Sequence, residues 1–125
     1  MRKVTQRIVE AWGQGRKLTV DNTRTDGTSI WLFDHEIVRI VNDDIEFTFA
    51  GYGTPTTRDR LNAVLNQHGI SVFQRKGEQM ATVSRYNGLD ATMTLDDDVW
   101  YSVCELRGVT RKEPEPVDDW ELLEA

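Results

Sequence analysis

The stretch that decides the fold is IEFTFAGYGTPTTRDRLNAVLNQHG, residues 45–69. It predicts a strand, a glycine-rich turn and the best-signalled helix of the chain. Ile45, Phe47 and Phe49 alternate with polar residues, and this period of two indicates a half-buried strand. Gly51 and Gly53 then allow the backbone to turn sharply toward the helix.

The main helix is predicted over about residues 56–68. Thr56 or Thr57 can be the N-cap, because a threonine hydroxyl accepts a backbone N–H that lacks a partner in the first turn. Pro55 prevents an earlier start, since it holds the preceding residue extended. An apolar stripe with helical spacing consists of Leu61, Val64 and Leu65. Gly69 is a natural helix stop, and the stripe is expected to pack on the strand before the helix.

The remaining segments predict short antiparallel strands on both sides of this helix. Four strands are predicted before the helix, over residues 17–25, 28–33, 37–41 and 45–49, with turns at 26–27, 34–36 and 42–43. Four more are predicted after it, over residues 71–75, 79–85, 91–95 and 99–106. Residues 4–12 carry apolar side chains at helical spacing and predict a short N-terminal helix. The fold class is therefore α+β, a mostly antiparallel meander sheet with one main helix packed on a face.

Charge divides the chain into two parts. It has 125 residues, with 15 Lys and Arg against 21 Asp and Glu, for a net charge of −6. Residues 113–125 carry acidic side chains and no basic one, so the formal excess lies there, whereas the first 24 residues are basic. We expect one domain over residues 1–110 and an acidic Pro/Glu linker and tail over 111–125.

Two segments of the first half resemble a family of small proteins encoded by bacteriophages and prophages. The segments are NTRTDG, residues 22–27, and AGYGTPTTRDRLN, residues 50–62. The resemblance implies a phage or prophage origin and brings no activity with it. It places the protein in the cytoplasm of the host bacterium, and the absence of a long apolar run fits that expectation.

Residues suited to metal binding or catalysis are few. His35, His68 and Cys104 are too few to supply a structural zinc site, and no metal or cofactor is expected. The acidic groups 43–44 and 96–98 are interpreted as solvated turns, although carboxylates can also hold Mg²⁺ or Ca²⁺. Cys104 lies in a predicted strand and is interpreted as a small core residue rather than a nucleophile.

The start of the main helix is a candidate anion site. Free N–H groups at a helix N-terminus attract phosphate or carboxylate, and basic side chains add to this. The candidate residues are Tyr52, Thr57, Arg58, Arg60 and Asn62. The alternative interpretation is helix capping and ordinary ion pairs.

The acidic tail is a candidate partner-binding segment. Its candidate residues are Asp118, Asp119, Trp120, Leu122 and Leu123. An aromatic and aliphatic segment among carboxylates can dock in a basic groove or on the nucleic-acid-binding surface of a protein partner. Packing on its own domain and an inert solubilising end are the alternatives.

These features lead to one functional hypothesis with two alternatives. The hypothesis is a phage-encoded, non-enzymatic accessory protein that binds a host or phage macromolecule, for instance to inhibit a host defence or nucleic-acid enzyme. The first alternative is a nucleic-acid-binding accessory factor that uses the basic N-terminal region and residues 57–60. The second is a minor virion or assembly component.

Overall fold

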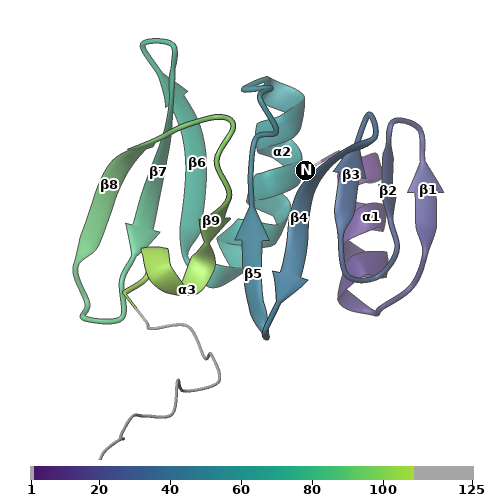
Figure 1. Ribbon diagram of the computed structural model, residues 1–125, viewed down its shortest axis with the longest axis horizontal. Helices are drawn as coiled ribbons and strands as arrows, with labels where there is room; N and C mark the ends of the chain where they lie inside the picture. The colour runs from purple at the N-terminus through teal and green to yellow at the C-terminus, as the bar shows by residue number, and fades with distance from the viewer. Residues whose placement is uncertain (1, 109–125) are drawn as a thin grey trace, which may run out of the picture.

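The structure is a computed structural model that describes residues 2–108. It has two antiparallel sheets and a few helices, which confirms the α+β class (Figure 1). The larger sheet has the strand order β1-β2-β3-β4-β5-β9 and the smaller one β6-β7-β8. The strands are β1 Leu18–Val20, β2 Thr23–Thr25, β3 Ile30–Leu32, β4 His35–Val41, β5 Asp44–Phe47, β6 Ile70–Arg75, β7 Glu78–Ser84, β8 Asp90–Leu95 and β9 Tyr101–Ser102. The helices are α1 Lys3–Gly13, α2 Pro55–Leu65, the short 3₁₀ helix η1 Asn66–His68, and α3 Val103–Leu106.

The two long helices lie behind the sheets in Figure 1. Helix α1 contacts β1 and β2, while α2 contacts β6 and α1. Side chains from both sheets and both helices form one hydrophobic cluster, which includes the fully buried Phe47 and Phe49. The predicted stripe of α2 is also fully buried in that cluster, through Leu61, Val64 and Leu65. The strand and helix of the deciding stretch therefore share a core.

Helix α2 begins one residue earlier than predicted. Thr54 is the N-cap, and its hydroxyl accepts a hydrogen bond from the backbone N–H of Thr57. Pro55 occupies the first helical turn, where its missing N–H leaves no partner unsatisfied. The prediction of Thr56 or Thr57 as the N-cap was therefore wrong, because Pro55 can begin the helix as well as prevent one from starting sooner.

The first three strands after α2 form a sheet of their own. Among the described residues, β6, β7 and β8 pair only with one another, whereas β9 joins β5 in the larger sheet. The side of β6 that faces away from β7 is blocked at Val72. The amide of Asn62 on α2 accepts from the Val72 N–H at 2.7 Å and donates to the Val72 carbonyl at 2.9 Å. A side chain thus occupies the position that a neighbouring strand would take, and the single predicted sheet becomes two.

The predicted strand 99–106 is short and ends in a helix. After β9, Ser102 caps α3, because its hydroxyl accepts from the Glu105 N–H. The buried carboxylate of Asp44 accepts hydrogen bonds from the Ser102 hydroxyl and from the Cys104 N–H. Cys104 is therefore a partly exposed helical residue, and its prediction as a strand residue was wrong.

The first predicted strand is likewise divided in two. Asp21 has a positive φ of 52°, so the chain reverses between β1 and β2, which pair with each other. The loop after β2 then passes close to the end of α1. Gly27 has a φ of +98°, and a Cβ there would stand 2.6 Å from the backbone of Gly15. Glycine is required at this position for both reasons.

Candidate functional site

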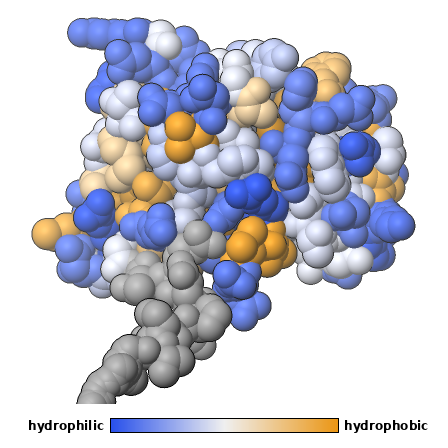
Figure 2. Space-filling view, in the orientation of Figure 1, coloured by the Kyte–Doolittle hydropathy of each residue, from blue (hydrophilic) through white to orange (hydrophobic). Residues whose placement is uncertain are grey.

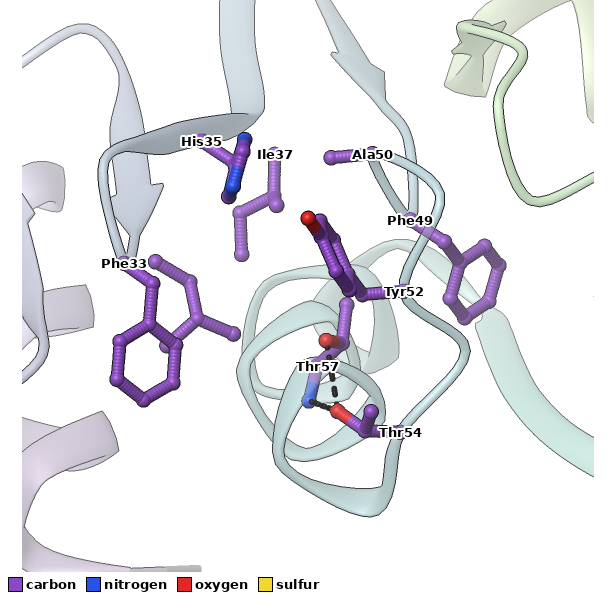
Figure 3. Close-up of a pocket in the computed structure, with 9 residues that line it drawn as sticks. Phe33, His35, Ile37, Phe49, Ala50, Tyr52, Thr54 and Thr57 are labelled. Atoms are coloured by element: carbon purple, nitrogen blue, oxygen red, sulfur yellow. Dashed lines mark hydrogen bonds between the residues drawn. The ribbon is translucent and has the colours of Figure 1, made fainter.

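A cavity lies between the β3–β4 turn and the loop that leads from β5 into α2. Its volume is about 320 Å³, and its lining is mostly apolar. The lining residues are Leu32, Phe33, His35, Ile37, Phe49, Ala50, Tyr52, Thr54 and Thr57 (Figure 3). Apolar lining with few polar groups is typical of a binding pocket.

Exposed rings stand around this cavity. Phe33 is 64% exposed and Tyr52 is 52% exposed, although both are large aromatic residues. The rings of Tyr52 and His35 lie toward each other, with centroids 4.9 Å apart and an angle of 41° between planes (Figure 3). Phe33 comes from the turn on one side and Tyr52 from the loop on the other (Figure 3). We call Phe33, His35, Tyr52 and the cavity the Phe33 site.

The backbone is strained on both sides of the cavity. Phe33 and Asp34 have φ values of 50° and 67°, in the two-residue turn between β3 and β4. Such turns favour Asn or Gly, as in the similar turn at Asn42. A side chain as large as phenylalanine rarely adopts a positive φ, and Ala50, with a φ of 55°, repeats the strain across the cavity.

The predicted anion-site residues are separated by the structure. Tyr52 and Thr57 line the cavity, but Thr57 is buried and its N–H is bound by the Thr54 hydroxyl. Arg58 donates to the Gly53 carbonyl and to the side chains of Gln74 and Gln79. Anion binding by these residues stays a prediction, and the capping and internal bonds are what the structure describes.

Arg60 is 4% exposed and links three elements of the fold. It donates to the hydroxyls of Thr23 on β2 and Thr5 on α1, and to the carboxylate of Asp59 at 2.9 Å. Thr5 also donates to Asp59. Burial lowers the pKa of Arg60, and the neighbouring Asp59 carboxylate opposes that shift. The guanidinium therefore joins α1, α2 and β2, as Asn62 joins α2 to β6.

Phe33, His35 and Ala50 were not among the predicted site residues. A turn was predicted at residues 34–36, whereas the turn lies at Phe33 and Asp34, and His35 begins β4. The missed signal was a phenylalanine beside Asp34 in a loop too short to bury it. The predicted tail residues, Asp118 to Leu123, lie outside the described residues.

The comparison with protein families gives a match over most of the chain. The family model described as Kyanoviridae Gp96 protein matches residues 1–102. The chain belongs to this phage-encoded family. No curated protein matches the chain. No solved structure matches it either.

The family match includes every residue of the Phe33 site and ends at the last residue of β9.

Within residues 2–108, no group of three His, Cys, Asp or Glu side chains is placed to hold a metal ion. None of the described helices is both long enough and apolar enough to cross a membrane.

A second hollow meets the site at Phe33. It has a volume of about 420 Å³ and is lined mainly by polar residues from β1, β2 and their turn. The Arg24 guanidinium lies 4.3 Å from the centre of the Trp31 ring and 3.6 Å from the Asp34 carboxylate. Phe33 therefore stands between an apolar cavity and a hollow whose lining includes one basic side chain, Arg24, and two acidic ones, Asp21 and Asp34.

Proposed function

We propose that this phage-encoded protein is a non-enzymatic accessory protein that binds a host or phage protein through the Phe33 site. The observation that carries the proposal is the position of Phe33. Its side chain is 64% exposed, so it adds little to the core, and its backbone has a positive φ. A left-handed backbone costs a residue with a side chain about 1–2 kcal/mol. Strain that the fold does not need is typical of functional positions.

The surroundings of Phe33 resemble the centre of a protein interface. Aromatic anchors beside a desolvated pocket carry much of the binding energy in such interfaces, and a polar rim surrounds them. Here Phe33 and Tyr52 are the exposed rings, the cavity accepts an apolar side chain of the partner, and Arg24 and Asp34 lie at the rim. The partner that fits presents a large apolar side chain flanked by polar groups.

The role of the partner is a further part of the proposal. A phage accessory protein of this kind acts in the host cytoplasm, and inhibition of a host defence or nucleic-acid enzyme is one form of action. The acidic tail supports that form through its composition, since residues 113–125 carry carboxylates without a basic side chain. Direct binding of nucleic acid has weaker support, because Arg58 and Arg60 already donate to protein groups.

Affinity purification from infected cells tests the proposal. The wild-type chain is compared with Phe33→Asn and with Lys76→Asn, a matched control at the corresponding position of the β6–β7 turn, where φ is also positive and the side chain is exposed. We expect one co-purifying protein to be lost with Phe33→Asn and retained with Lys76→Asn. Equal recovery with all three chains would contradict the proposal.

A chain that lacks residues 113–125 is the second arm of this experiment. Loss of the partner with the truncated chain, but not with Phe33→Asn, would assign binding to the tail instead of the Phe33 site. Loss with either change would mean that both segments contact the partner.

A further inference from the structure

The edges of the two sheets differ in how they are protected. In the larger sheet the edge strands are β1, of three residues, and β9, of two. In the smaller sheet, Asn62 blocks the β6 edge at Val72. The remaining edge is β8, which has six residues and is the outermost strand at the left of Figure 1. It contains no Pro, Gly or Lys, the residues that commonly protect exposed edges.

The β6–β7 turn determines which backbone groups of β8 point outward. In a hairpin with a two-residue turn, the residues that flank the turn form a hydrogen-bonded pair, here Arg75 and Glu78. Hydrogen-bonded pairs then alternate along the ladder, so Val72 points away from β7, as its bonds to Asn62 confirm. The same alternation carried across β7 directs the N–H and C=O groups of Asp90, Thr92 and Thr94 away from β7. No hydrogen bond from these outward backbone groups is found within residues 2–108.

The side chains of β8 also leave one face incompletely covered. Leu95 is buried in the core, while Ala91 and Met93 on the same face are only partly buried. Leu89 continues that face, because its carbonyl accepts from the Arg85 N–H in the same register, yet it is 67% exposed. Thr92 and Thr94 lie exposed on the opposite face. Within residues 2–108, the strand therefore ends the sheet with an apolar row that no other segment covers.

We propose that a second copy of this chain covers this edge, with two β8 strands paired antiparallel about a two-fold axis at Thr92. Each Thr92 faces Thr92 of the other copy, and Asp90 faces Thr94. The outward groups of these residues form hydrogen-bonded pairs, which exchange both backbone bonds. Two three-stranded sheets then become one continuous sheet across a closed, isologous interface.

Side-chain complementarity selects this register. Ala91 lies opposite Met93 of the other copy, which sets a small residue against a large one. The exposed Leu89 lies opposite Leu95, so its apolar surface is covered. A shift by two residues toward Asp96 would instead place Asp90 opposite Asp96 and Leu89 opposite Asp97. Like charges directly opposite each other destabilise a sheet, and a leucine beside a carboxylate gains no apolar contact.

The same pairing explains why a second copy fits better than a strand of another protein. Residues 89–95 of one copy supply both members of every cross-strand pair, because the residues before Thr92 complement those after it. The interface is independent of the Phe33 site, which lies on the larger sheet and the loop before α2.

Sedimentation of the full chain over a concentration series tests the proposal. We expect wild type to pass from monomer to dimer, and Thr92→Pro to stay monomeric. Because the Thr92 N–H points outward, proline there removes no bond to β7, and proline is tolerated at such edge positions. Thr92→Lys is a second variant, for use if Thr92→Pro fails to fold. It places two ammonium groups opposite each other across the axis and should also be monomeric. Thr82→Lys is the matched control, since Thr82 neighbours Thr92 on the central strand β7, and it should still dimerise.

Amide hydrogen exchange locates the interface. The Thr92 amide should become protected as the concentration rises, and Phe33→Asn should leave this protection unchanged. A wild-type chain that sediments as a monomer throughout would overturn the proposal. A dimer in which the Thr92 amide exchanges as fast as in the dilute protein would overturn it as well, because the contact would then lie elsewhere.

Discussion

Replacing Phe33 by asparagine should leave the protein as stable as before or more stable. Asparagine tolerates a positive φ, so the substitution relieves most of a strain of about 1–2 kcal/mol. It also removes the apolar contacts of a side chain that is 64% exposed. Full burial of a phenylalanine contributes about 1.5–3 kcal/mol, so the third that is buried contributes about 0.5–1 kcal/mol. The net gain in the free energy of unfolding lies between about zero and 1 kcal/mol.

Thermal and denaturant unfolding measure this change. A gain of that size raises Tm by up to about 4 °C in a domain of this length. Lys76→Asn relieves the same strain in the β6–β7 turn, and because that side chain is exposed it should gain most of the strain of about 1–2 kcal/mol. If Phe33→Asn lowered the free energy of unfolding by more than about 1 kcal/mol, phenylalanine would serve the fold, and the reason for assigning it to binding would be lost.

Three further substitutions test the internal contacts of the fold. Arg60→Ala should lower the free energy of unfolding by about 3 kcal/mol or more in urea unfolding, because the loss of a buried guanidinium leaves Asp59 without its charged partner; a loss below 1 kcal/mol would contradict the linking role. Asn62→Ala should cost about 2 kcal/mol in the same assay and speed exchange of the Val72 amide, because that N–H loses its acceptor. Burial, and secondarily the charge of Arg107, lower the pKa of His68, so the folded state disfavours the proton and stability should decline as the pH falls below 6.5, the value of an unperturbed histidine. In His68→Gln this decline should be smaller, and an identical pH profile would refute the shift.

Local patterns predicted most of the secondary structure. Alternation in Ile45, Phe47 and Phe49 and the stripe that begins at Leu61 gave the strand and helix that share the core. The prediction of secondary structure failed where the local sequence is compatible with both a strand and a helix. Residues 99–106 are apolar enough for a strand, but Asp44, distant in sequence, binds the Ser102 hydroxyl and the Cys104 N–H and favours a helix there.

The candidate site was predicted only in part. Tyr52 and Thr57 were among the predicted residues and line the cavity. Arg60 and Asn62 are close to them in sequence, yet a helix directs successive side chains in different directions, so Arg60 reaches α1 and Asn62 reaches β6. Phe33 was missed because hydrophobic periodicity treats every phenylalanine as a core residue.

The sequence by itself determined the α+β class, the position of α2 and the phage family, since each depends on residues that are close together in the chain. Only the tertiary structure decided which side chains of residues 45–69 make hydrogen bonds within the fold and which are exposed at the surface. The reason is that exposure and hydrogen bonding depend on contacts between distant segments, such as Arg60 with Thr5 and Asn62 with Val72. The position of the strained, exposed Phe33 beside an apolar cavity also depends on such contacts. The β3–β4 turn, the loop after β5 and the start of α2 meet only in the folded chain.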